Sequence, residues 1–183
     1  MVNNANKPSI FLDRDGVVVK THIRANKPFA VNNIDDFVIL PGVKEAIKEL
    51  KRLGFLVIVV TNQPDISKGL IKIATINRMH EILMSQLALD DIKLCPHLSE
   101  DKCNCRKPNP GMLLEAAKEY SINLKNSYMI GDRVSDIKAG EKVGCKCIFI
   151  DHGYAETEGE NFEINMKVKS LPEAVNLIKN SEK

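Results

Sequence analysis

Short runs of apolar residues alternate along the chain with segments in which apolar residues recur every three or four positions. The first run predicts a strand over residues 9–13, and the run at 55–60 predicts a strand buried on both faces because none of its positions is polar. Further apolar runs predict strands at 92–95, 127–130 and 145–150. The helical spacing predicts helices at 43–53, 73–89, 111–120, 134–143 and 172–179.

Strands that alternate with helices are typical of right-handed βαβ crossovers. The expected fold is therefore α/β, a doubly wound parallel sheet with a Rossmann-like core. At 183 residues the chain suits a single domain, 1–183. Residues 17–38 have weak periodicity and are expected to form a short flap, and no insertion is long enough for a large cap domain. Loops are expected at 96–110 and in the Glu- and Gly-rich segment after Ile150.

The composition is that of an ordinary globular protein, with 44% hydrophobic and 27% charged residues. A net charge of +2, 5% aromatic residues and no tryptophan argue against a nucleic-acid partner. No apolar run approaches the ~20 residues that a membrane span needs, and the polar N-terminus lacks the apolar core of a signal peptide. Five cysteines in such a chain indicate free thiols or a metal site. We expect a cytoplasmic monomer.

Two aspartates, Asp13 and Asp15, follow the first predicted strand and precede Gly16. Side chains at i and i+2 of a strand point the same way, so both carboxylates are expected at the strand's carboxyl end, where open α/β sheets bind ligands. Two carboxylates at one point repel each other unless a cation lies between them or one takes a proton. The pair therefore indicates a magnesium site or a nucleophile beside an acid, with an Asx turn as the alternative.

Polar residues also follow the other predicted strands. In Thr61-Asn62-Gln63 a hydroxyl and an amide suit phosphate oxygens, although a helix cap or turn uses the same residue types. Arg106-Lys107 precedes two prolines, which stiffen the backbone. Asp132 ends another strand and Asp136 follows it by four residues, a placement that also suits a helix dipole. A separate structural explanation for every strand end is less economical than one site.

These four segments resemble the four motifs of the haloacid dehalogenase-like phosphatases, in the same order and over nearly the whole chain. The matching residues are Asp13-Arg14-Asp15-Gly16, Thr61-Asn62, Lys107, and Gly131-Asp132 with Asp136. Val17 departs from the threonine that many members have after the glycine. The resemblance implies a phosphatase built on the haloacid dehalogenase core.

The resemblance also implies roles for the matching residues. Asp13 attacks phosphorus and forms an aspartyl-phosphate, while Asp15 protonates the leaving oxygen and later deprotonates water. Thr61 and Lys107 hold the transferring phosphoryl group, whose charge needs fixed donors. The expected substrate-binding residues are Asn62, Arg106 and Arg133.

A magnesium ion completes the expected catalytic site. The resemblance implies that Mg²⁺ is bound by the carboxylates of Asp13 and Asp132 and by the backbone carbonyl of Asp15. Asp136 is expected to orient metal-bound water or Lys107 from behind. Physical chemistry agrees, because an aspartate nucleophile and a phosphate dianion repel each other unless cations offset their charges.

Three cysteines and a histidine lie close together, in Cys95-Pro96-His97 and Cys103-Asn104-Cys105. Four such ligands suit tetrahedral zinc with no open position, which is a structural site, and free thiols are the alternative. Zinc bound to the loop at 95–107 would fix the direction in which Arg106-Lys107 approaches a phosphate. Cys145 and Cys147 lie in an apolar strand and are expected to be core residues.

The cysteine loop and Cys105-Arg106-Lys107-Pro108 resemble the zinc-loop, capless subgroup, which includes heptose-bisphosphate and histidinol-phosphate phosphatases. The resemblance implies a sugar-phosphate substrate: removal of the 7-phosphate of D-glycero-D-manno-heptose 1,7-bisphosphate, in nucleotide-heptose and lipopolysaccharide synthesis. Arg106 is then the candidate for the second phosphate, because its planar fork suits it. The alternative substrate is histidinol phosphate, in histidine biosynthesis.

Individual positions favour different members of the subgroup. Pro108-Asn109-Pro110-Gly111-Met112 resembles the heptose enzymes, as do Ile66, Lys68 and Gly69 after Gln63. The short spacing from His97 to Cys103 and Gly131-Asp132-Arg133 resemble the histidinol enzymes. Pro64-Asp65 replaces the Ser-Gly that the heptose enzymes usually carry.

Other classes of function fit less well. A scaffold protein without chemistry is disfavoured because Asp13 and Asp15 are both present, and a phosphomutase or dehalogenase would need a lid domain. A nucleic-acid phosphatase is disfavoured by the absence of a basic stripe. His22, His80 and His152 are expected to be surface or packing residues, with contact between His22 and substrate as the alternative.

Overall fold

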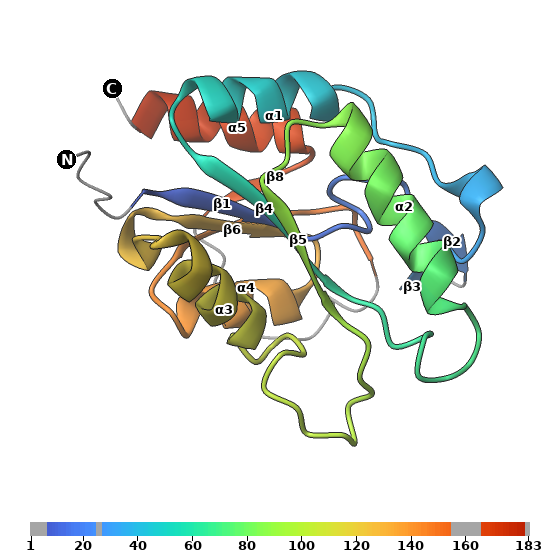
Figure 1. The fold of residues 1–183 in the computed structure, drawn as a ribbon. Helices are drawn as coiled ribbons and strands as arrows, with labels where there is room; N and C mark the ends of the chain where they lie inside the picture. The colour runs from blue at the N-terminus through green and yellow to red at the C-terminus, as the bar shows by residue number, and fades with distance from the viewer. Residues whose placement is uncertain (1–6, 25–26, 155–165, 182–183) are drawn as a thin grey trace.

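The computed structural model describes residues 7–24, 27–154 and 166–181. Within these ranges a six-stranded parallel sheet has the order β5-β4-β1-β6-β7-β8, and helices cover both of its faces (Figure 1). The strands of this sheet are β1 (Ser9–Leu12), β4 (Leu56–Asn62), β5 (Asp91–Cys95), β6 (Tyr128–Gly131), β7 (Lys146–Ile150) and β8 (Lys167–Val168). The helices are α1 (Val43–Arg52), α2 (Ile73–Gln86), α3 (Gly111–Tyr120), α4 (Val134–Glu141) and α5 (Leu171–Ser181), with short 3₁₀ turns at Ile34–Asp36 and Leu124–Asn126.

Strand β1 lies in the middle of the sheet, and the chain order reverses around it. From β1 the chain adds β4 and β5 on one side, and then β6, β7 and β8 on the other. Leu12 pairs in parallel register with Val59 of β4 and Ile130 of β6, so the carboxyl ends of these three strands lie at one edge. A reversal of this kind opens a crevice at that edge, which is where ligands bind in open α/β sheets.

Side chains that alternate along β1 build a separate apolar core on each face of the sheet. Ile10 and Leu12 pack with the buried faces of α1 and α5, whereas Phe11 packs with α3 and with Ala139 of α4. Figure 1 shows α1 and α5 above the sheet and α3 and α4 below it. Each buried aliphatic or aromatic side chain contributes roughly 1.5–3 kcal/mol, so the two layers hold the strand ends rigidly in register.

The structure confirms the predicted α/β fold with a doubly wound parallel sheet. Helix α3 has the predicted bounds, whereas β4 runs on to Asn62 and α2 already ends at Gln86. The prediction of a loop up to the last helix was wrong at Lys167–Val168, which form β8. Backbone pairing of Phe149 with Lys167 defines this two-residue strand, and so short a segment carries no periodic signal of its own. Residues 155–165 of the expected loop lie outside the described residues.

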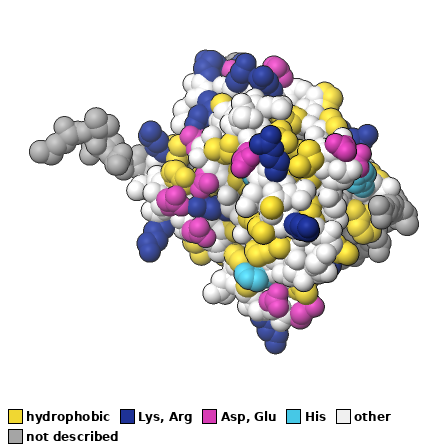
Figure 2. Space-filling view, turned by 45° about the vertical axis from the view of Figure 1, so that its right-hand side comes forward, with side chains coloured by type: hydrophobic (Ala, Val, Ile, Leu, Met, Phe, Trp, Pro, Cys, Tyr) yellow, Lys and Arg dark blue, Asp and Glu magenta, His cyan; other side chains and the backbone are white. Residues whose placement is uncertain are grey.

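The expected flap contains a small antiparallel hairpin, β2 (His22–Arg24) with β3 (Lys27–Phe29). In Figure 1 it appears at the right of the view, on the side toward which β1 runs. In Figure 2, Lys and Arg side chains are interspersed with Asp and Glu over the visible face rather than gathered into a basic stripe. Among the described helices, none is long and apolar enough to cross a membrane.

Candidate active site

A buried lysine joins two carboxylates at the carboxyl end of β1. Lys107 Nζ lies 2.7 Å from Oδ1 of Asp13 and 2.7 Å from Oδ1 of Asp136, and it also donates to the carbonyl oxygen of Val60 at 2.7 Å. Burial alone would lower the pKa of Lys107, but the charges of the two carboxylates outweigh it and raise that pKa above its ordinary value. The lysine therefore stays charged at the point where β1 and β4 end.

The end of β4 holds Lys107 in place through its backbone. Asn62 donates from Nδ2 to the carbonyl oxygen of Lys107 at 3.1 Å and accepts from the backbone N–H of Lys107 at 3.1 Å. These two hydrogen bonds to the backbone of Lys107 tie the loop after β5 to the sheet. Lys107 is therefore positioned almost as precisely as a residue at the end of a strand, which a loop without these bonds would not achieve.

Asp132 follows β6 and lies beneath the same site. Asp13, Asp132 and Asp136 each place an oxygen within 4.8 Å of the others, and all three are buried. Burial, followed by the charges of Asp13 and Asp136, raises the pKa of Asp132 well above its ordinary value. Burial also raises the pKa of Asp136 to about 6, although Lys107 opposes the shift.

This carboxylate cluster fits a hard divalent cation. Within the described ranges, neither carboxylate oxygen of Asp132 accepts a hydrogen bond, although both are buried. Such orphaned acceptors are costly unless a cation binds them, and carboxylate oxygens are the ligands that Mg²⁺ prefers. Gly16 keeps the approach open, because a Cβ atom there would lie 2.0 Å from Oδ2 of Asp132.

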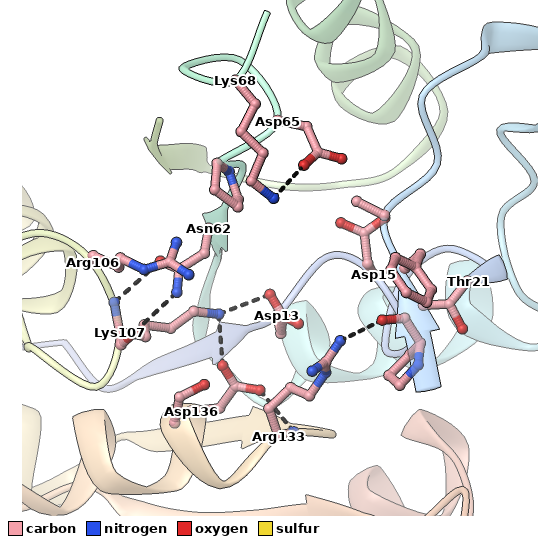
Figure 3. Close-up of a pocket in the computed structure, with 15 residues that line it drawn as sticks. Asp13, Asp15, Thr21, Asn62, Asp65, Lys68, Arg106, Lys107, Arg133 and Asp136 are labelled. Carbon is pink, nitrogen blue, oxygen red and sulfur yellow. Dashed lines mark hydrogen bonds and ion pairs between the residues drawn. The ribbon is translucent and has the colours of Figure 1, made fainter. Parts of the chain in front are cut away.

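A cavity of about 270 Å³ opens above the cluster. Figure 3 shows Lys107, Asp13 and Asp136 converging at its floor, with Asp15 beside Thr21 on the flap side. Of the predicted site residues, the cavity is lined by Asp13, Asp15, Asn62, Arg106, Lys107, Arg133 and Asp136. Four other lining residues carry polar groups. Asp65 and Lys68 belong to the segment after Gln63 that was compared between members of the subgroup, whereas Thr21 and Ser135 were not singled out from the sequence.

Two predicted contacts are placed differently from the rest. Thr61 is buried at the end of β4, where its Oγ1 accepts a hydrogen bond from Gln63 at 2.9 Å, and it is not among the residues that line the cavity. Arg133 lines the cavity while its Nη2 donates to the carbonyl oxygen of Pro28 in the flap at 2.8 Å. His22 lies on the hairpin near Asp36 rather than on the cavity wall.

The four predicted zinc ligands gather in the loop after β5. Sγ of Cys105 lies 3.1 Å from that of Cys95 and 3.4 Å from that of Cys103, and Nδ1 of His97 lies 3.2 Å from Sγ of Cys105. Two sulfurs bound to one tetrahedral zinc ion lie about 3.8 Å apart, so the cluster suits zinc after a small expansion. The backbone N–H of Arg106 points to Sγ of Cys103 at 3.4 Å, which links the cluster to the cavity wall.

The remaining two cysteines lie apart from this cluster. Cys145 is buried and Cys147 is half-buried, and both pack into the core between β6, β7 and the helices below the sheet. Burial raises the pKa of each thiol to about 12. Both are therefore unreactive packing residues, as expected from their place in an apolar strand.

Known proteins are similar in sequence to this chain over most of its length. A family model described as HAD-hydrolase-like, for haloacid dehalogenases, matches residues 104–174. A D-glycero-beta-D-manno-heptose-1,7-bisphosphate 7-phosphatase from Photorhabdus laumondii is 38% identical and covers 94% of this chain and 97% of the relative. The Escherichia coli K12 enzyme of the same name is 36% identical, and the match covers 92% of this chain and 93% of that enzyme.

The chain belongs to the haloacid dehalogenase-like phosphatases. This phosphatase also shares its fold with the D,D-heptose 1,7-bisphosphate phosphatase of B. bronchiseptica, solved with magnesium and phosphate. The two have a TM-score of 0.80 at 29% identity, over 95% of this chain and 99% of the other. The corresponding enzyme from Burkholderia thailandensis has the same fold, with a TM-score of 0.64 at 24% identity over 94% and 99% of the two chains. The predicted family is confirmed.

The sequence reasoning missed two buried residues of the phosphatase that contact Asp15. Arg14 donates to both oxygens of Asp15, and Gln63 donates from Nε2 to Oδ2 of Asp15 at 2.7 Å. A signal for Arg14 was present, because an arginine placed directly after a buried strand must find a carboxylate nearby. No such signal existed for Gln63, whose partner is set by the pairing of β1 with β4.

Proposed function

We propose that this phosphatase removes the 7-phosphate of D-glycero-D-manno-heptose 1,7-bisphosphate through an aspartyl-phosphate intermediate. The observation that carries the chemistry is the contact of Lys107 with Asp13 at the floor of the cavity, 2.7 Å from nitrogen to oxygen. The substrate is supported by the curated relatives, which bear that activity in their names at 36–38% identity. The histidinol-phosphate alternative has no comparable support and is not retained.

In the first step Asp13 attacks phosphorus, and the bond between phosphorus and the sugar oxygen breaks. Lys107 and Thr61 hold the phosphoryl oxygens, and Asp136 keeps Lys107 aimed at them through its ion pair. The leaving sugar oxygen takes a proton from Asp15. In the second step Asp15 takes a proton from water, and the water oxygen attacks phosphorus of the aspartyl-phosphate. The bond between phosphorus and Asp13 breaks, which restores the Asp13 carboxylate and releases inorganic phosphate.

The carboxylates of Asp13 and Asp132, with the backbone carbonyl of Asp15, would hold a magnesium ion. When bound, Mg²⁺ supplies positive charge that offsets the repulsion between Asp13 and the phosphate. The orphaned oxygens of Asp132 support this ligand set.

Residues of the cavity wall would select the substrate. Arg106 binds the second phosphate, the one that does not react, because its guanidinium forms a planar fork. Asn62 and Arg133 contribute further substrate contacts. Zinc bound by Cys95, His97, Cys103 and Cys105 fixes the loop at about 95–107, from which Arg106 projects.

The cellular setting follows from the proposed substrate. We infer that the protein acts in the cytoplasm, in nucleotide-heptose precursor synthesis for lipopolysaccharide. It acts as a monomer, as a single domain over residues 1–183 with a flap at about 17–38.

The experiment that tests the substrate compares kcat/KM with magnesium for heptose 1,7-bisphosphate, histidinol phosphate and an aryl phosphate. We expect the bisphosphate to be preferred by at least about 100-fold, which corresponds to about 2.7 kcal/mol of transition-state discrimination. Arg106→Met should lower that preference and leave the aryl phosphate almost unchanged. Equal rates for all three substrates, or a preference for histidinol phosphate, would overturn the proposed substrate.

A further inference from the structure

Arg14 is the largest fully buried side chain in the described part of the chain. Arg14 lies between the two catalytic aspartates, Asp13 and Asp15, in the sequence. Of these two, its guanidinium contacts Asp15. Nε donates to Oδ2 of Asp15 at 3.0 Å and Nη2 donates to Oδ1 at 3.1 Å, with Nη2 also 2.9 Å from Oδ2. A buried guanidinium is costly to desolvate, so a contact this complete indicates a function for the pair.

The rest of the guanidinium is held as firmly. The carbon atom at its centre lies 5.6 Å from the ring centroid of Phe37, and Nη1 lies 3.4 Å from Nε2 of His80. Arginine has no acceptor, so His80 accepts this bond and its ring proton is on Nδ1. The imidazole is therefore neutral where it contacts Arg14, and it fixes the far end of the guanidinium without competing for Asp15.

Gln63 contacts Asp15 from the direction of β4. It is fully buried, and its Nε2 donates to Oδ2 of Asp15 at 2.7 Å and to Oγ1 of Thr61 at 2.9 Å. Its backbone N–H donates to the carbonyl oxygen of Cys95 at 2.7 Å, which ties it to the end of β5. Gln63 is therefore held both by its backbone N–H and by its side-chain amide group.

These donors treat the two oxygens of Asp15 differently. Oδ2 accepts from Nε of Arg14 and from Gln63, which uses both of its lone pairs. Among the described residues, Oδ1 accepts from Nη2 of Arg14 alone, so it keeps one lone pair. Because Asp15 lines the cavity, this remaining lone pair is the one available to a proton that is exchanged with substrate or water.

We propose that Arg14 and Gln63 are positioning residues that fix the Asp15 carboxyl so that Oδ1 is the atom that gives and takes the proton. The inference rests on the proposed function, since it assigns an atom to its acid–base step. When Asp13 forms its bond to phosphorus, the bond from phosphorus to the leaving oxygen breaks and its electron pair goes to that oxygen. The leaving oxygen then takes the proton from Oδ1, and Asp15 is left as the carboxylate that Arg14 and Gln63 stabilise.

The test uses two substrates that differ in their need for an acid. A primary sugar phosphate, either the heptose bisphosphate or mannose 6-phosphate, leaves as an alkoxide that needs a proton, whereas p-nitrophenolate leaves without one. The parameter is kcat/KM, which reports the first phosphoryl transfer and not the later hydrolysis. Its ratio between the two substrates in one preparation is independent of the fraction of protein that is folded.

We expect Arg14→Lys and Gln63→Met to lower kcat/KM for the sugar phosphate by about 30- to 300-fold, within the range of general acid catalysis. For p-nitrophenyl phosphate the loss in the same variant should be at least about tenfold smaller. The control is Arg52→Lys, because Arg52 forms the same two-pronged contact with Glu49 on the exposed face of α1, at 2.7 and 2.8 Å. It should change neither substrate.

Asp15→Asn separates failure of this inference from failure of the proposed function. If Asp15→Asn loses more activity on the sugar phosphate than on p-nitrophenyl phosphate but Arg14→Lys and Gln63→Met do not, the positioning role is wrong and the acid stands. If Asp15→Asn lowers both substrates equally, the acid assignment itself fails. If Arg14→Lys does not fold, Gln63→Met alone tests the positioning role. Gln63 also contacts Thr61, but a loss that acts through Thr61 affects the phosphoryl group that both substrates share. Such a loss lowers both substrates equally and leaves their ratio unchanged.

Discussion

The ammonium nitrogen of Lys107 lies 2.7 Å from Oδ1 of Asp13, although 94 residues separate the two along the chain. Two features of the fold produce this contact. Parallel pairing of β1 with β4 aligns the carboxyl ends of both strands, and Asn62 at the end of β4 holds the backbone of Lys107. The ion pair between Lys107 and Asp13 therefore depends on the pairing of the two strands.

Replacement of this lysine is expected to cost both stability and activity. Lys107→Met leaves Asp13 and Asp136 buried without their cation, so the free energy of unfolding should fall by about 3–5 kcal/mol in magnesium-free buffer. Loss of a fixed donor to the phosphoryl group should lower kcat by about 100- to 1,000-fold. Urea denaturation and phosphate release measure the two effects.

Lys51→Met is the matched control for this prediction. Lys51 pairs with Asp90 at a partly exposed position between α1 and the start of β5, so its loss should cost only about 1 kcal/mol and leave kcat unchanged. Equal losses of stability in the two variants would contradict the burial argument for Lys107.

The sequence was sufficient to predict the fold and the strand ends, because both depend on local patterns. The apolar run before Asp13 and the spacing within α3 are signals of this kind. The contact between Gln63 and Asp15 could not be predicted, since it requires the register between β1 and β4. The same holds for the ion pair of Lys68 with Asp65 at the cavity wall, which forms through a turn whose geometry no periodicity encodes.

Gly16→Ala is expected to damage the magnesium site. The backbone at Gly16 has a φ of +89°, and a Cβ atom would lie 2.0 Å from Oδ2 of Asp132. The carboxylate must move, so magnesium affinity, measured by the metal dependence of phosphate release, should weaken at least about tenfold, as when a metal ligand loses its support.

Gly54→Ala provides the comparison, because Gly54 has nearly the same φ, +90°, and nothing within 4 Å of an added Cβ. It should lose about 1 kcal/mol of stability from backbone strain and keep its metal dependence. An unchanged magnesium requirement in Gly16→Ala would show that Asp132 does not bind the metal.

Zinc is expected to remain with the purified protein in a ratio of about one per chain, because a closed four-ligand site binds it tightly. Cys103→Ser should lose the metal and lower the melting temperature, whereas Cys145→Ser, outside the cluster, should keep it. Elemental analysis and thermal denaturation measure both. If the wild-type protein carries no zinc, the cluster is a group of free thiols.

The pH dependence of stability should carry a contribution from His80. Burial, and then the charge of Arg14, lowers the pKa of this half-buried imidazole from 6.5 to about 4. Because folding lowers the pKa of His80, its neutral imidazole contributes fully to the stability of the protein above pH 6.5. That contribution is lost as the pH falls toward 4. At about 1.4 kcal/mol per unit the loss amounts to at most roughly 3 kcal/mol.

His80→Gln keeps an acceptor for Arg14 but does not titrate, so its stability should gain on that of the wild type between pH 6.5 and 4. The difference between the two proteins isolates His80, because all other groups titrate in both. A constant difference between wild type and His80→Gln across this range would mean that His80 is not buried in its neutral form.

The most direct test of the account follows heptose 1,7-bisphosphate by ³¹P NMR in the presence of the phosphatase and magnesium. The 7-phosphate signal should convert to inorganic phosphate while the 1-phosphate signal persists in the product, and Asp13→Asn should show no conversion. Loss of the 1-phosphate instead, or turnover by Asp13→Asn at the wild-type rate, would contradict it.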